Sequence, residues 1–176
     1  MRKAMGLSNM LIGAGLLVLA FLAVFFGGGL ERIWTLFGPA DLGSVNFETL
    51  ERRTTPNDAL VCPPDVCRAK TDMAPPIYSL KPEALKKVMA QVVASEPDVI
   101  AVDSTPLGDR YIQRTRWMRF PDTIVVRYLP RADEQSTVAI YSRSQLGKGD
   151  LGVNKARVAR WLSKLSAEAA VARASN

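Results

Sequence analysis

The run from Met10 to Leu30 contains no charged residue, and it constrains this chain more than any other stretch. As an α-helix rising about 1.5 Å per residue it would span roughly 30 Å, the thickness of a bilayer's hydrocarbon core. Arg2 and Lys3 precede it, and the positive-inside tendency places such an N-terminus in the cytoplasm. We therefore expect residues 1–30 to form an uncleaved transmembrane anchor in the cytoplasmic (inner) membrane, with the rest of the chain outside, in the periplasm.

A cleaved signal peptide is the alternative for the same segment. The apolar stretch is long for a signal peptide, and no small-x-small cleavage site precedes a polar mature start. No cysteine follows the apolar run directly, which excludes a bacterial lipoprotein. Residues 31–46 are then predicted to be a juxtamembrane linker, whose Trp34 and Phe37 suit the lipid headgroup level. Residues 47–176 are predicted to be one extracytoplasmic globular domain.

Composition narrows the chemistry of that domain. The chain has no histidine, which removes every histidine-based general base, catalytic triad and metal site. Cys62 and Cys67 are too few soft ligands for a structural zinc site. We expect no metal and no cofactor. The net charge of +6 favours contact with an anionic lipid or polymer, but no nucleic-acid motif accompanies it, and no nucleic-acid partner is expected.

The two cysteines are separated by four residues. In an oxidising compartment such a pair is bridged more often than free, so we predict a disulfide between Cys62 and Cys67. The spacing is not the two-residue spacing of thioredoxin-like motifs, and two prolines stiffen the loop. A structural role is therefore favoured over a redox-active one.

Periodicity predicts an α+β domain in the order helix, four strands, helix. Turn-forming residues dominate from Phe47 to Ala74, which is predicted to be an ordered loop. A helix is expected from about Lys81 to the stop at Glu96–Pro97. The expected strands are 99–102 (buried), 111–118, 124–129 and 136–144, with turns at 105–109, 120–123 and 130–135. We expect an antiparallel sheet of about four strands covered on one face by two helices.

The most distinctive stretch joins the last strand to the last helix, and its sequence is Tyr-Ser-Arg-Ser-Gln-Leu-Gly-Lys-Gly-Asp-Leu-Gly-Val-Asn from Tyr141 to Asn154. Its three glycines permit a tight loop. Such a loop can hold an anion at the helix start, or it can only turn the chain and cap the helix. We predict that Asp150 or Asn154 caps the helix and that Arg143 pairs nearby.

This stretch, with Arg157 and Trp161-Leu162 after it, resembles the bacterial and plastid family called domain of unknown function 1499. Phe47-Glu-Thr-Leu50, Pro56 to Pro64 and Arg119-Phe-Pro-Asp122 resemble it as well. The resemblance covers roughly Phe37 to Leu165 and implies that these segments belong to one domain of an uncharacterised envelope or membrane protein. The family brings no established activity, cofactor or catalytic residue, so the resemblance implies no mechanism.

Two ligand-related hypotheses follow from the charged residues. If the strands form a meander, several arginines gather at one end of the sheet, where a fork of guanidinium groups and the glycine loop would bind an anionic group. The alternative is that these arginines pair internally, with Asp122 and Asp150, or face solvent. The candidate binding residues are Arg114, Arg116, Arg143, Lys148, Asp150 and Asn154, with Arg127 as a further member of the arginine group.

The enzymatic alternative is an aspartate-dependent envelope hydrolase. A pair of carboxylates about 5 to 9 Å apart can hydrolyse a glycosidic bond, and the candidate acids are Asp103, Asp109, Asp122 and Asp150. A serine nucleophile, Ser142 or Ser144, activated by Lys148 is a weaker variant, since no nucleophile-elbow sequence surrounds it. We expect a non-enzymatic binding or structural envelope protein, whose partner is another protein or an anionic envelope component.

Overall fold

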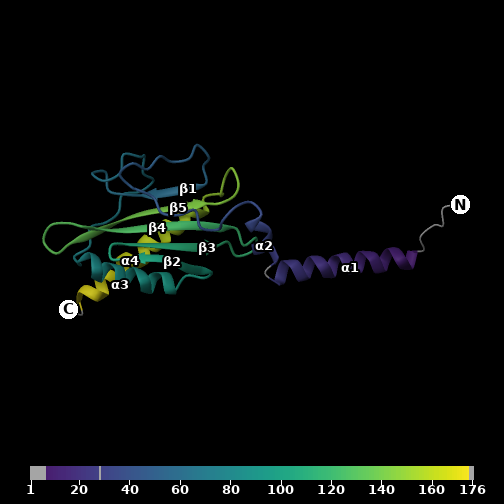
Figure 1. Ribbon diagram of the computed structural model, residues 1–176. Coiled ribbons are helices and arrows are strands. Elements are labelled where there is room, and N and C mark those ends of the chain that lie inside the picture. The colour runs from purple at the N-terminus through teal and green to yellow at the C-terminus, as the bar shows by residue number, and fades with distance from the viewer. Residues whose placement is uncertain (1–6, 28, 175–176) are drawn as a thin grey trace. The chain divides into compact units, whose positions relative to one another are not determined.

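The computed structural model describes residues 7–27 and 29–174, and it divides into two compact units, one up to Gly38 and one from Pro39 (Figure 1). Arg2 and Lys3, on which the predicted orientation depends, lie outside the described residues. The first unit holds two helices, α1 (Leu7–Phe26) and α2 (Gly29–Thr35). The second holds every strand that the structure describes and two further helices.

The predicted membrane anchor falls on the first unit. Helix α1 is apolar over most of its length, and its side chains from Asn9 to Val24, such as Leu17, are exposed. Within residues 7–27 and 29–174, no helix by itself has the length and hydropathy of a membrane span, whereas α1 and α2 meet both requirements together, across a bend. The transmembrane helix therefore stays a prediction.

The second unit is an α+β domain with a five-stranded antiparallel sheet (Figure 1). The strand order β1-β5-β4-β3-β2 makes a meander of the last four strands and adds β1 beside β5. The predicted α+β class with an antiparallel sheet is confirmed, although the sheet has five strands where about four were expected. The elements are β1 (Asp58–Val61), α3 (Pro82–Ala94), β2 (Val99–Thr105), β3 (Gly108–Arg114), β4 (Pro121–Pro130), β5 (Ser136–Ser144) and α4 (Val153–Ala174).

Helices α3 and α4 pack on one face of this sheet, here called the helix side. Side chains alternate along a strand, so every second residue of β4 and β5, such as Tyr128 and Ile140, faces the helices. Trp161 of α4 is fully buried there and meets the ring of Tyr111 edge-on, with ring centroids 5.8 Å apart. The apolar stripe of α4 is thus the centre of the main core.

The opposite face, here called the loop side, is covered by the segment that leads into and out of β1. Phe47 and Leu60 pack there against Val125 and Tyr141 in a second apolar cluster. Cys62 and Cys67 belong to this cluster and form a disulfide, as predicted. Both faces of the sheet are therefore covered, one by helices and one by an irregular segment closed by a disulfide.

Strand β1 corrects the sequence analysis, which predicted an ordered loop without a strand from Phe47 to Ala74. Its four residues pair with β5 from Asp58 opposite Arg143 to Val61 opposite Ile140. Three of the four are buried, so the strand shows no polar alternation. A short strand without alternation, surrounded by turn formers, carries little periodicity to detect.

Strand β2 and the turn between β3 and β4 correct two further predictions. Strand β2 was expected to be buried, but it is an edge strand with mostly exposed side chains, including Ile100. The turn expected at 120–123 lies instead at 115–120, where the Thr115 N–H donates to the Phe120 carbonyl. Pro121 then opens β4, a position that proline tolerates because the first residue of a strand need not donate to the ladder.

The end of α3 agrees with the predicted stop and is tied to α4. Ser95 caps the helix, and the Glu96 side chain next to it is almost fully buried. Burial raises the pKa of Glu96, but hydrogen bonds from Arg160 and Lys164 outweigh this and bring it down to about 2. Glu96 is therefore a carboxylate at neutral pH that fixes the two helices to each other.

Candidate functional site

The distinctive stretch from Tyr141 to Asn154 begins the last helix, and Asp150 caps it as predicted. The Asp150 carboxylate accepts the N–H groups of Gly152, at 2.9 Å, and of Asn154, at 2.8 Å. Gly152 has a φ of 78°, a conformation that suits glycine. These bonds satisfy N–H groups that the first turn of a helix cannot pair internally.

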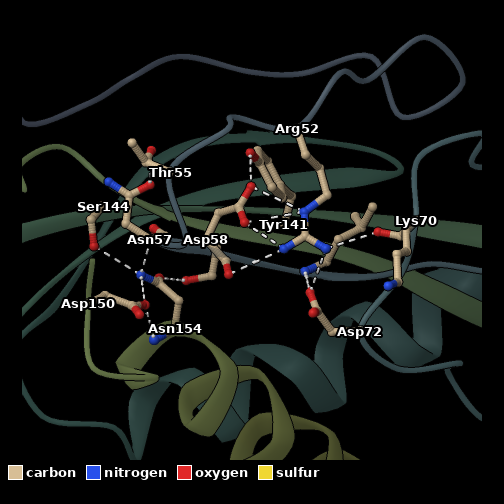
Figure 2. Close-up of polar contacts among 12 residues, drawn as sticks. Arg52, Thr55, Asn57, Asp58, Lys70, Asp72, Tyr141, Ser144, Asp150 and Asn154 are labelled. Carbon is tan, nitrogen blue, oxygen red and sulfur yellow. Dashed lines mark hydrogen bonds and ion pairs between the residues drawn. The ribbon is translucent and has the colours of Figure 1, made fainter. Parts of the chain in front are cut away.

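Asn154, the other predicted cap, is instead the centre of a buried network. Its Nδ2 donates to the Ser144 hydroxyl at 3.0 Å, to the Asn57 carbonyl at 3.2 Å and to Asp150 at 2.7 Å (Figure 2). Its Oδ1 accepts from the hydroxyl of Ser142. The side chain has no exposed surface, and one amide thus joins β1, β5 and the loop before α4.

Arg157, one turn further along α4, extends the network along the helix side of the sheet to β4 and β3. Its guanidinium donates to Asp122 at 2.6 Å, to Gln113 at 2.6 Å, to Ser142 at 2.9 Å and to Asn154 at 2.7 Å. The side chains of Arg157 and Asp122 are 3% and 2% exposed, so this ion pair is buried. The second Asp122 oxygen accepts from the hydroxyl of Ser144.

These contacts define the site that we call the buried network: Asn57, Gln113, Asp122, Ser142, Ser144, Asp150, Asn154 and Arg157. It draws on β3, β4, β5 and α4, on the residue before β1 and on the loop before α4, and each member bonds to another member. Buried polar groups of this kind specify one arrangement of the elements around them, because any other arrangement leaves donors or acceptors unpaired. The chemistry of the distinctive stretch is therefore structural.

A second polar cluster lies on the loop side of β1, beside the buried network (Figure 2). Arg52 donates from Nε to Asp58 at 3.2 Å and pairs with Asp72 at 2.9 Å, and the Tyr141 hydroxyl donates to Asp58 at 2.6 Å. The hydrogen bond to Asp58 raises the pKa of Arg52 further. This cluster fixes the irregular segment to the sheet.

The predicted binding arginines are spread over the loop side. Among the residues that the structure describes, Arg143 has no carboxylate partner; its Nη2 donates to the carbonyls of Leu42 and Gly43, at 2.6 and 2.9 Å. Burial lowers the pKa of Arg143. Arg114 lies at the same end of the sheet, opposite Pro121.

The remaining predicted cations stand apart from that pair. Arg127 lies at the other end of β4 and pairs with Glu48, while Arg116 and Lys148 are exposed on loops. The structure thus places the arginines of the strands on the loop side, and Asp122 and Asn154 on the helix side. The sheet therefore separates the strand arginines from Asp122 and Asn154, which the sequence analysis had placed in one binding group.

A pocket of about 300 Å³ opens on the loop side next to the hairpin between β2 and β3. The apolar part of its lining is formed by Phe47, Leu107 and Val125, and the basic part by Arg110 and Arg127. Arg110 is held by Asp41 and Asp103, and Arg127 by Glu48 at 2.6 Å. Sequence reasoning missed this pocket, since residues far apart in the chain form it and no periodic pattern marks them. It has the apolar lining and few polar groups of a small-molecule site.

Two of the candidate catalytic aspartates, Asp103 and Asp109, lie on opposite sides of the sheet. Asp103 pairs with Arg110 on the loop side, whereas Asp109 points to the helix side. Burial raises the pKa of Asp109, but hydrogen bonds from Lys86, Ser104 and Tyr128 outweigh this and leave it below its usual value. A general acid needs a raised pKa, so Asp109 does not qualify.

The serine nucleophile with a lysine base, which the sequence also suggested, is no better arranged for catalysis than the aspartates. Ser142 and Ser144 are buried in the network, whereas Lys148 is exposed. Lys86 does reach a serine, with its Nζ 2.8 Å from the Ser104 hydroxyl. The same Nζ is 2.8 Å from the carboxylate of Asp109, so this lysine is part of an ion pair.

The comparisons with known proteins agree with this description. A family model described as protein of unknown function DUF1499 matches residues 52–165, and the chain belongs to that family. The match begins at Arg52 and includes every member of the buried network. No curated protein matches the chain.

Proposed function

We propose that this chain is an envelope protein anchored in the cytoplasmic membrane, whose extracytoplasmic domain binds a ligand rather than transforming one. The uncharged run from Met10 to Leu30, preceded by Arg2 and Lys3, supports the anchor and its orientation. The Cys62–Cys67 disulfide supports an oxidising compartment. The pocket on the loop side is the observation that supports binding.

The orientation has a direct test. A reporter that is active only after export, fused behind Asn176, should be active in bacterial cells, and a reporter that works only in the cytoplasm should be silent at the same position. Replacing Arg2 and Lys3 with glutamate should reduce the exported signal, because it removes the positive charges that hold the N-terminus inside. An active cytoplasmic reporter would contradict both the compartment and the orientation.

The pocket suggests the chemical class of the ligand. Phe47, Leu107 and Val125 suit an apolar chain, and Arg127 suits a carboxylate or phosphate. The side chains of Arg127 and Glu48 are 41% and 47% exposed, and such a surface pair contributes only about 0–1 kcal/mol. An anionic group can therefore take the place of Glu48 at little cost. We propose an amphiphilic envelope component with an anionic head.

Hexyl phosphate is a soluble probe with both features. We expect it to bind saturably to the full chain in lipid nanodiscs, measured by calorimetry against empty nanodiscs. Arg127→Gln should weaken binding about tenfold, because a hydrogen bond to a charged group contributes about 1.5–3 kcal/mol. Hexanol, which has the chain but no charge, should bind correspondingly less tightly.

Arg131→Gln is the matched control, since Arg131 also pairs with a surface carboxylate, that of Asp65, outside the residues that line the pocket. This variant should bind hexyl phosphate like the parent. Equal weakening by Arg127→Gln and Arg131→Gln would reduce the effect to general surface charge. Absence of saturable binding to the parent would remove the pocket as a ligand site.

The hydrolase remains the second candidate function, and no observation favours it. The carboxylates of Asp103 and Asp122 pair with arginines, and Asp150 is occupied by the N–H groups of the last helix. A glycosidase needs one carboxylic acid that stays protonated near its working pH. We therefore keep binding as the proposed activity.

A further inference from the structure

Two loops at one end of the sheet present apolar side chains to solvent. The turn 115–120 between β3 and β4 leaves Trp117 68% exposed, and the loop 145–152 between β5 and α4 leaves Leu151 fully exposed. The loops are neighbours, because the Gln145 N–H donates to the carbonyl of Pro121, the first residue after the turn. Figure 1 shows both loops leaving the same end of the sheet.

Cations accompany these apolar tips. The guanidinium of Arg116 lies over the ring of Trp117, with its Cζ 5.4 Å from the centroid, and Lys148 is exposed on the second loop. Asp150, an acid of the second loop, is directed inward to cap α4. The charge that the two loops offer a partner is therefore mainly positive.

Hydrogen bonds fix the conformation of the loop 145–152 around Leu151. Leu151 has a φ of 53°, a left-handed conformation that is unfavourable for leucine, and the Asp150 bonds hold the chain on either side of it. A leucine there gains no packing within the domain. Its side chain projects into the surroundings from a rigid base.

The same end of the sheet receives the chain from the first unit. The Leu42 N–H donates to the Thr123 hydroxyl at 2.9 Å, and that hydroxyl donates to the Ala40 carbonyl at 3.2 Å. Thr123 is two residues beyond Pro121, about 7 Å along the strand. A short connection from α2 therefore enters the domain beside the turn 115–120.

We propose that the Trp117 and Leu151 loops dock this end of the domain on the surface of an anionic phospholipid bilayer. The inference rests on the proposed membrane anchor, which would hold the entry point close to the lipid. Tryptophan favours the headgroup level, leucine the acyl boundary just below it, and arginine and lysine the phosphates above. Docking would restrict how the domain turns relative to the membrane and would leave the opposite end free.

Lipid contact can be measured on the full chain in nanodiscs with a headgroup-level spin-labelled lipid as quencher. Single cysteines at Trp117 and Leu151, carrying an environment-sensitive fluorophore, should lose most of their emission in anionic discs. Ile77→Cys is the matched control, because Ile77 is 62% exposed and adjoins Tyr78, which pairs with Ser136 at the other end of β5. Its label should keep the emission that it shows without quencher.

The charge requirement has its own control. Arg116→Gln or Lys148→Gln should each reduce the docked fraction about fivefold at low occupancy, the change expected for one lost cation near an anionic surface. Lys81→Gln removes an exposed lysine that pairs with Glu134 in the turn between β4 and β5, at the opposite end of the sheet, and should change nothing. Equal quenching in neutral discs would overturn the anionic part of the proposal.

The outcomes separate this proposal from the anchor. A chain that does not copurify with nanodiscs would overturn the anchor and, with it, the docking that rests on it. A chain that copurifies but shows the same emission at all three labelled positions would overturn the docking alone. Quenching at Trp117 and Leu151 but not at Ile77 would support it, and would exclude a surface reserved for a protein partner.

Discussion

Replacing Arg157 with methionine should lower the free energy of unfolding by about 3–5 kcal/mol, the cost of stranding one partner of a buried ion pair. Asp122 would lose its cation in a site where its side chain is 2% exposed, and Gln113, Ser142 and Asn154 would each lose a hydrogen-bond donor. Urea titration of the parent and the variant measures the difference. A variant that is unfolded without urea also meets the expectation.

Two comparisons make this result specific. Arg131→Met removes a bidentate pair with Asp65 at the surface and should cost no more than about 1 kcal/mol. The double variant Arg157→Met/Asp122→Leu should be more stable than Arg157→Met alone, because no carboxylate is left unpaired. A cost for Arg157→Met no greater than that for Arg131→Met would show that the buried network does not hold the elements together.

Asn154→Asp should destabilise the domain by about 3 kcal/mol or more, although the two side chains have almost the same shape. The change replaces the Nδ2 donor by an acceptor that faces three acceptors, the Ser144 hydroxyl, the Asn57 carbonyl and Asp150. Unpaired buried groups cost about 1–3 kcal/mol each, and a second carboxylate beside Asp150 adds repulsion. Thermal or urea unfolding at neutral pH measures the loss.

Measuring the stability of the Asn154→Asp variant at lower pH provides an internal control for this prediction. The new carboxyl is destabilising in its charged form, so its pKa is raised in the folded state. The deficit relative to the parent should therefore shrink as the pH falls from that raised pKa toward about 4, the pKa of an unfolded aspartate. Asn154→Ala, which adds no charge, should show a deficit that depends little on pH. A pH-independent deficit for Asn154→Asp would assign the effect to lost bonds alone.

Elements with a long hydrophobic periodicity could be predicted from the sequence, whereas features that depend on how the strands pair could not. The helix predicted from Lys81 corresponds to α3, and the strand predicted at 136–144 to β5. Strand β1 escaped prediction because it is short and packed on both faces. The turn at 120–123 was misplaced because proline favours a turn, whereas Pro121 opens β4.

In the candidate site, too, local contacts could be predicted from the sequence, whereas contacts between residues far apart in the chain could not. The cap by Asp150 is a local feature, and Asp150 was one of the two cap candidates in the sequence. The pairing of Asp122 with Arg157 depends on the register of β4 beside β5, and a slip of one residue would move Asp122 to the loop side. One signal was present in the sequence: Asn154 and Arg157 interrupt the apolar stripe of α4 that continues through Val158 and Trp161, and a polar residue on a buried stripe needs a buried partner.

The position of β1 has a consequence for the order in which the domain can form during synthesis. Asp58 emerges from the ribosome early, yet its strand pairs with β5, and Asn57 bonds to groups that follow β5. Contacts that join distant parts of a chain slow folding, because the intervening loop must be closed first. The first half of the domain thus has no separate fold to adopt and must wait for β5 and α4. If the domain is exported, as we propose, this delay would be useful, because a chain that folds late can still be threaded through the membrane.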